Sequence, residues 1–317
     1  MKRIGKKFLA IFSISLIVII ILGVVLAYIP GRMTEGHTND IVGMYFDDMN
    51  YSKEQFENTW VSKVEEDEIL AYVGHKIPIY YYKSENSYDN KTMVLVHWHE
   101  SNHKAMYPIA EFFLEQNFNV VLYDAPAHGA NTAKRVSFGY YEKDDLKSVI
   151  TYIKSKMSKE NIIGALGQSM GGTTVAYYSG TDHAKQNLDF AIIDSAYTSM
   201  DAIIATEIDK NFLPLPTKLI IRLGSISNKF MYSFSYEDVN AVKSIRSSKI
   251  PMLIMHSKAD KKCPFFMGKE LFDAIPHKNK NFIIFDNSSH LEAFWDENQK
   301  YKSAISEFIE DYSLSVK

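Results

Sequence analysis

The sequence predicts an α/β protein whose central sheet is mostly parallel and covered by helices on both faces. After about residue 68, short apolar runs alternate with longer segments of helical periodicity, which is typical of a parallel sheet with helical crossovers. The apolar runs are nearly continuous, as expected for strands buried on both faces. The chain has 317 residues, 46% of them hydrophobic and 23% charged, which is an ordinary globular composition with enough residues for a large core.

The elements are expected in the following order. Residues 31–67 are expected to be a tether and N-terminal segment with one short helix at Lys53–Trp60, and residues 68–317 form the α/β domain. Strands are predicted at Ile69–Val73 and Lys76–Tyr82 (a hairpin), Met93–His97, Asn119–Tyr123, Ile162–Leu166, Phe190–Ile193, Met252–His256 and Phe282–Phe285. Helices are predicted at Tyr107–Gln116, Tyr141–Met157, Met170–Ser179, Phe265–Ala274 and Glu297–Tyr312.

Residues 197–248 interrupt this alternation. The stretch is too long for a simple crossover and carries apolar clusters at residues 212–215 and 230–234. We interpret it as a small helical cap inserted over the functional site. An extra pair of helices packed beside the sheet is the alternative.

The N-terminus predicts a membrane anchor. Residues 8–29 contain no charged side chain and would form a helix of ~33 Å, enough for a ~30 Å hydrocarbon layer. The four basic residues before them favour a cytoplasmic N-terminus, so residues 1–30 are expected to span the cell membrane once, with the body on the outer side. A cleaved signal peptide ending near Ala27 is the alternative, although such signals have shorter apolar cores of ~7–15 residues.

Charge and cysteine content exclude some functions. Four of the 35 basic residues lie in the first seven positions, so the rest of the chain carries 31 basic against 38 acidic side chains. This acidic body offers no electrostatic attraction for nucleic acid. Cys263 is the single cysteine, so the chain has no internal disulfide and cysteine usage does not indicate an oxidising compartment.

A candidate nucleophile lies between a predicted strand and a predicted helix. Gly167-Gln168-Ser169-Met170-Gly171 matches G-x-S-x-G, which is a weak signal alone but follows strand Ile162–Leu166 directly and opens the next helix. This is the setting of a nucleophile elbow, in which Ser169 occupies a sharp turn. Glycines at 167 and 171 avoid collisions with the neighbouring strand and helix. The alternative is a glycine-rich turn between a strand and a helix, in which the serine has no catalytic role.

A serine hydroxyl needs a base, and the base needs an orienting acid. Asp260 and His290 each follow a later predicted strand, in the chain order nucleophile, acid, base. They should therefore lie at the same sheet edge as Ser169, with His290 as base and Asp260 holding its tautomer. Asp194, which also ends a strand, and Asp286, near His290, are alternatives for the acid.

The negative charge that develops on a substrate oxygen needs two amide donors. The backbone N–H of Met170, at the start of the helix after Ser169, is one candidate. The second is expected in the loop after strand Met93–His97, and we assign it to the backbone N–H of His99.

Several segments of the chain carry a family resemblance. They are VLVHWH (94–99), YDAPAHGAN (123–131), LGQSMGG (166–172), HSKADKKCP (256–264) and NSSHLEAF (287–294). From about Glu68 to about Tyr312 the sequence resembles the α/β-hydrolase superfamily, and more narrowly its bacterial membrane-anchored members related to the serine aminopeptidase and monoglyceride-lipase branch. Trp98 stands where this family usually has a glycine.

The resemblance implies a serine hydrolase that uses Ser169, His290 and Asp260, with no metal and no cofactor. It implies cleavage of an ester, thioester or amide. Among these we favour a carboxylic ester, either a small molecule or a lipid, because of the apolar clusters in the 197–248 segment. A serine peptidase or amidase with the same three residues is the alternative.

Two other classes stay open at this point. His97, His99 and His103 form an H-x-H-x-x-x-H cluster after a strand, a spacing that can bind zinc in a metallohydrolase. A hydrolase-like body without activity would be a binding module, although such proteins typically lack the serine or the histidine, and this chain has both.

Overall fold

The computed structural model describes residues 33–60, 63–84, 91–156, 162–208 and 216–313. The predicted anchor at residues 1–30 lies outside this part of the chain and stays a prediction. Within the described residues, no helix combines the length and the apolar character needed to cross a membrane.

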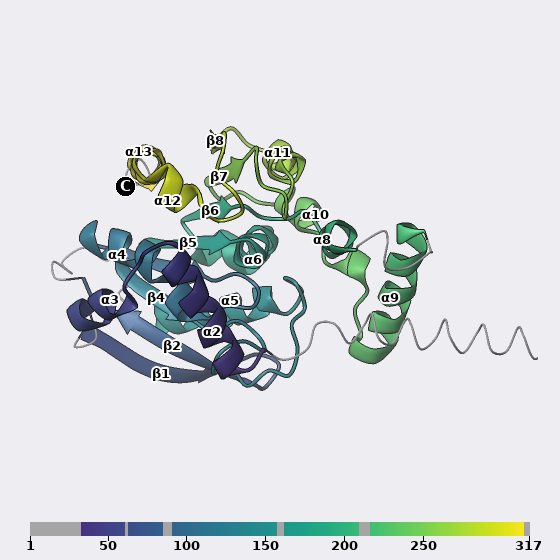
Figure 1. Cartoon of the computed structure of the whole chain (residues 1–317), viewed down its shortest axis with the longest axis horizontal. Coiled ribbons are helices and arrows are strands. Elements are labelled where there is room, and N and C mark those ends of the chain that lie inside the picture. The colour runs from purple at the N-terminus through teal and green to yellow at the C-terminus, as the bar shows by residue number, and fades with distance from the viewer. Residues whose placement is uncertain (1–32, 61–62, 85–90, 157–161, 209–215, 314–317) are drawn as a thin grey trace, which may run out of the picture.

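An eight-stranded sheet forms the centre of the molecule (Figure 1). Its strands are β1 (Val64–Leu70), β2 (Lys76–Tyr82), β3 (Lys91–Val96), β4 (Asn119–Tyr123), β5 (Ile162–Gln168), β6 (Phe190–Asp194), β7 (Met252–Ser257) and β8 (Lys280–Phe285). Their order in the sheet is β1-β2-β4-β3-β5-β6-β7-β8. Strands β3 to β8 run parallel, whereas β2 pairs antiparallel with both β1 and β4. The mostly parallel sheet is confirmed.

Successive side chains on the inner strands point to opposite faces, so the sheet has two cores. Met93 and Leu95 of β3 belong to one hydrophobic cluster, and Val94 and Val96 belong to the other. Helices that contribute to the first cluster are α2 (Glu35–Asp48), α3 (Lys53–Trp60), α4 (Tyr107–Glu115), α12 (Ala293–Asp296) and α13 (Asn298–Ser313). Those of the second are α5 (Glu142–Lys156), α6 (Met170–Ser179), α7 (Asp182–Asn187), α10 (Ala241–Ile245) and α11 (Phe265–Ala274).

Most predicted elements are present with small shifts at their ends. Strands β2 and β4 and helices α3, α6 and α11 have the predicted bounds. The hairpin's first strand begins earlier than predicted, at Val64, and its turn occupies residues 71–75. Short helix α7 was not predicted.

The N-terminal segment differs most from the expectation of a tether. Helix α2 is capped by the Thr34 hydroxyl, which accepts the backbone N–H of His37, and buries Val42 and Phe46 in the core. Its buried positions are few, so the apolar stripe was too narrow to reveal the helix in the sequence.

Segment 197–248 contains helices α8 (Met200–Glu207) and α9 (Thr217–Tyr232), a 3-10 turn at Tyr236–Asp238 and α10. Helices α8 and α9 contact each other, and α9 lies at the margin of the molecule away from the sheet (Figure 1). Helix α10 packs in the second hydrophobic cluster and precedes β7.

Candidate active site

Ser169 occupies a sharp turn between β5 and α6. Its backbone has φ 53° and ψ −114°, in the left-handed half of conformational space, as a nucleophile elbow requires. A Cβ at Gly171 would lie 2.0 Å from the Val96 carbonyl oxygen, and one at Gly167 would lie 2.2 Å from the carbonyl oxygen of Gly171. The Ser169 N–H donates to the Asp194 carbonyl, 2.9 Å away, which ties the turn to the end of β6.

The structure brings Ser169, His290 and Asp260 into one chain of hydrogen bonds. The Ser169 Oγ lies 2.9 Å from His290 Nε2, and His290 Nδ1 lies 2.7 Å from Asp260 Oδ2. The three residues come from loops at the carboxyl ends of β5, β7 and β8, the shared edge predicted from the sequence. In this geometry His290 Nδ1–H donates to the carboxylate and Nε2 is left to accept the serine proton.

The loop after β7 holds Asp260 in place. Its Oδ1 accepts backbone N–H groups from Lys262 (2.9 Å) and Cys263 (2.8 Å), so the buried carboxylate is well satisfied. His256 closes the same loop, because its Nε2–H donates to the Cys263 carbonyl at 2.7 Å. Burial lowers the pKa of His256, so this imidazole is neutral next to the Asp260–His290 pair.

The two alternative acids have other partners. The buried Asp194 carboxylate accepts hydrogen bonds from Gln168 Nε2 and the Tyr301 hydroxyl, both at 2.9 Å, and burial raises its pKa. Asp286 is exposed and pairs with Lys258 at 2.6 Å. Of the three candidates, Asp260 is therefore the residue that contacts His290.

Cys263 lies closer to Ser169 than its place in the sequence indicates. It is fully buried, and its thiol lies against the Ser169 side chain. Burial raises the pKa of the thiol well above its ordinary value, so it is an un-ionised neighbour. The feature of the sequence that could have indicated this proximity is the position of Cys263 three residues after Asp260.

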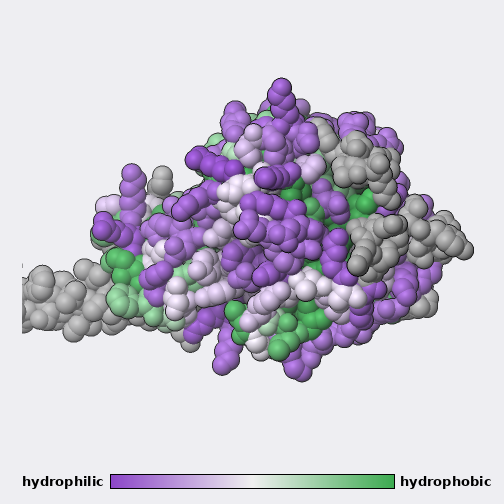
Figure 2. Space-filling model, turned by 180° about the vertical axis from the view of Figure 1, so that it is seen from behind, coloured by the Kyte–Doolittle hydropathy of each residue, from purple (hydrophilic) through white to green (hydrophobic). Residues whose placement is uncertain are grey.

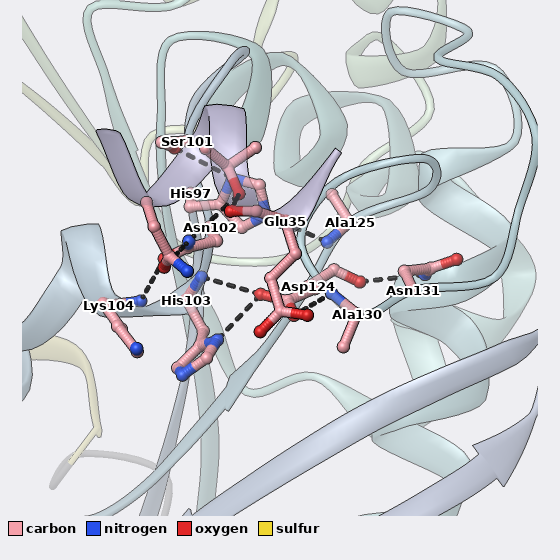
Figure 3. Close-up of polar contacts among 12 residues, drawn as sticks. Glu35, His97, Ser101, Asn102, His103, Lys104, Asp124, Ala125, Ala130 and Asn131 are labelled. Atoms are coloured by element: carbon pink, nitrogen blue, oxygen red, sulfur yellow. Dashed lines mark hydrogen bonds and ion pairs between the residues drawn. The ribbon is translucent and has the colours of Figure 1, made fainter. Parts of the chain in front are cut away.

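A polar network supports the loop that carries His99 (Figure 3). Asp124, at the end of β4, accepts the backbone N–H of His103 at 2.9 Å, His103 Nδ1–H at 2.8 Å and the Ala130 N–H at 2.9 Å. His97 Nε2 accepts the Ala125 N–H at 2.9 Å, so the proton of this imidazole lies on Nδ1, which contacts the Trp98 carbonyl. Burial lowers the pKa of His97 to about 4.

These contacts give His97 and His103 structural partners in place of a shared metal. Across the described ranges, no group of three or more histidine, cysteine or acidic residues is arranged to hold a metal ion. Trp98 packs edge-on against Tyr45 of α2, with ring centres 4.9 Å apart. Trp98, which stands where the family usually has a glycine, therefore has a packing partner in α2.

A cavity of about 360 Å³ opens above Ser169. Both predicted amide donors, His99 and Met170, line it together with Ser169. Its other lining residues are mainly apolar and come from the loop before α5 and from the 197–248 segment: Phe138, Tyr197, Ile203, Ile204, Ile208, Ile220, Ile221 and Tyr236, with Glu100, Glu207 and Lys262. Burial lowers the pKa of the His99 side chain to about 4, so this imidazole is uncharged near neutral pH.

Comparison with known proteins agrees with this fold. Residues 91–220 match the family model described as the alpha/beta hydrolase fold. YqkD of Bacillus subtilis (strain 168) is 25% identical over 98% of this chain and 99% of its own length. Esterase Pf2001 of Pyrococcus furiosus superposes with a TM-score of 0.65 at 21% identity, covering 83% of this chain and 96% of that one. Esterase EaEST of Exiguobacterium antarcticum gives 0.56 at 20% identity, covering 78% and 100%.

Fold, family match and elbow geometry together define the class of the protein. The described chain has the fold of the α/β-hydrolase superfamily, and the model of that family matches residues 91–220. This confirms the broader part of the resemblance seen in the sequence, and the narrower branch stays a prediction.

Proposed function

We propose that this protein is a serine hydrolase that cleaves a carboxylic ester through an acyl-enzyme intermediate. The observation that carries the proposal is the unbroken hydrogen-bond chain from Ser169 through His290 to Asp260 beneath an apolar cavity. Two of the structural neighbours are themselves esterases by name, which supports an ester substrate.

The geometry supports the following steps. Ser169 Oγ attacks the ester carbonyl carbon while His290 Nε2 takes its proton, and Asp260 stabilises the imidazolium that forms. The backbone N–H groups of Met170 and His99 donate to the carbonyl oxygen as it becomes negative. His290 then gives the proton to the departing alcohol. A water molecule, deprotonated by the same imidazole, releases the acid from Ser169.

The cavity supports an ester with an apolar acyl or alcohol part. Isoleucine side chains from α8 and α9 form much of its wall, and apolar groups gain by leaving water for such a surface. Glu207 and Lys262 add charged groups to the lining.

Labelling with a fluorophosphonate tests the proposal. The full chain, extracted in mild detergent, is expected to be labelled as wild type and as Ser195→Ala, a matched change of a buried serine at the end of β6, but not as Ser169→Ala. Hydrolysis of 4-nitrophenyl esters of increasing acyl length should be lost in the same variant. Equal labelling of wild type and Ser169→Ala would show that Ser169 is not the activated serine.

A further inference from the structure

Helix α9 exposes an apolar stripe on the side that faces away from the protein. Leu219, Ile226 and Phe230 are 42%, 47% and 87% exposed, and the half-buried Leu223 falls between them. These four positions recur at intervals of four, three and four residues, so they lie on one side of the helix. Buried positions such as Gly224 lie on the opposite side. Figure 2 shows hydrophobic residues at the surface at the end of the molecule that α9 forms.

A row of basic side chains borders this stripe. Lys218, Arg222 and Lys229 are exposed and fall on one flank of the stripe at helical spacing, and α9 contains no acidic residue. Lys229 also pairs with Asp238 at 3.1 Å. An apolar stripe beside a basic flank is the pattern of a helix that lies in the interface of an anionic membrane. The body as a whole carries more acidic than basic side chains, so the basic flank of α9 is a local exception that favours an anionic partner at this helix.

The described chain begins on the same side of the molecule. The backbone N–H of Met33 donates to the Ala127 carbonyl at 2.8 Å. Ala127 belongs to the hydrophobic cluster that contains Ile203 of α8, and α8 contacts α9. The apolar segment 8–29 ends four residues before Met33, a stretch that spans at most ~14 Å. A bilayer entered by residues 8–29 would therefore lie close to the α8–α9 side.

We propose that the exposed stripe of α9 docks on the surface of the anionic phospholipid bilayer into which residues 8–29 insert. Leu219, Ile226 and Phe230 enter the boundary between headgroups and acyl chains, while Lys218 and Arg222 contact lipid phosphates. Because α8 and α9 also line the cavity above Ser169, docking places that cavity beside the bilayer. An ester carried by the membrane then reaches it without crossing bulk water, a consequence that rests on the proposed function.

Site-specific fluorescence tests the docking independently of catalysis. Cys263 is fully buried, so a cysteine introduced at Phe230→Cys can be labelled selectively with a polarity-sensitive fluorophore. The full chain is reconstituted into vesicles of phosphatidylethanolamine and phosphatidylglycerol. The matched control is Ser155→Cys, an exposed site near the end of α5, which leads to the amino-terminal edge of β5 and so away from the cavity.

Docking predicts that nitroxide-labelled lipid quenches the probe at position 230 at least twofold more than the probe at 155, with the opposite order for aqueous iodide. Iodide quenching at 230 as strong as at 155 would overturn the proposal. So would disulfide cross-linking through Phe230→Cys without lipid quenching, because it would show that a second copy covers the stripe.

A double variant, Ile226→Asp with Phe230→Asp, provides a functional readout. It should hydrolyse a vesicle-borne ester at least fivefold more slowly than wild type and a water-soluble short-chain ester at the wild-type rate. Equal loss on both substrates would contradict a docking role for the stripe. If wild type hydrolyses neither ester, the proposed function fails, and the quenching experiment still decides the docking.

Discussion

Asp194 ends β6 and Asp260 follows the neighbouring strand β7, yet their side chains have different surroundings. Asp260 accepts two backbone N–H groups and also contacts His290, so its carboxylate is held in place and directed at the imidazole. Asp194 instead joins Gln168 and Tyr301 below the elbow, where it supports packing. At the scale of single residues, the assignment of the acid therefore depends on which hydrogen-bond donors each carboxylate meets.

We expect Asp260→Asn to lower kcat for a soluble ester by roughly 10³–10⁴-fold, because the amide no longer holds the reactive tautomer of His290. Asp194→Asn is the matched control at the adjacent strand, and it should keep at least a tenth of the activity while lowering the melting temperature. Both variants are compared by steady-state kinetics and thermal unfolding. A greater loss in Asp194→Asn than in Asp260→Asn would reassign the acid.

At the scale of elements, the packing of α6 against β3 fixes the position of Ser169. The helix begins where its backbone passes over the end of β3, and Gly171 leaves no room for a side chain at that crossing. Any side chain there must push α6 away from the strand, and Ser169 moves with the helix. The glycines of the elbow therefore allow the sharp turn at Ser169 and also set the distance between α6 and β3.

Gly171→Ala is expected to lower the free energy of unfolding by about 1–3 kcal/mol, as overpacking does, and to reduce activity, because the new Cβ would meet the carbonyl of Val96. Gly43→Ala in α2 is the matched control. No atom lies within 4 Å of the added Cβ there, so this change should leave stability equal or raise it by up to about 1 kcal/mol. Urea unfolding measures both. Equal stability of the two variants would mean that α6 can shift without cost.

At the scale of the whole molecule, buried neutral histidines make the free energy of unfolding depend on pH. Burial lowers the pKa values of His97 and His99 to about 4 and that of His128 well below its ordinary value of 6.5. Above pH 6.5 these side chains are neutral in both the folded and the unfolded chain. Below it, the unfolded chain binds protons that the folded chain excludes, so acid favours unfolding.

We therefore expect the free energy of unfolding to fall between pH 6.5 and pH 4, by up to about 1.4 kcal/mol per pH unit for each histidine that stays neutral in the fold. Urea unfolding at pH 7, 6 and 5 measures the slope. His97→Asn should be less stable than wild type at pH 7 but show a flatter dependence on pH. A wild-type stability that is level across this range would contradict the burial of neutral imidazoles.

The sequence by itself determined the strand–helix alternation, the elbow at Ser169 and the placement of Asp260 and His290 at one sheet edge. These features depend on local periodicity, on short turns and on the rule that parallel strands end together, all of which can be read over a few consecutive residues.

Tertiary structure alone decided which aspartate contacts His290, that the thiol of Cys263 lies against Ser169, and that residues 35–48 form a helix against Trp98. It also decided which side of α9 is buried and which is exposed. These outcomes depend on contacts between segments far apart in the chain, where the geometry of packing outweighs the weak local preferences of the residues involved.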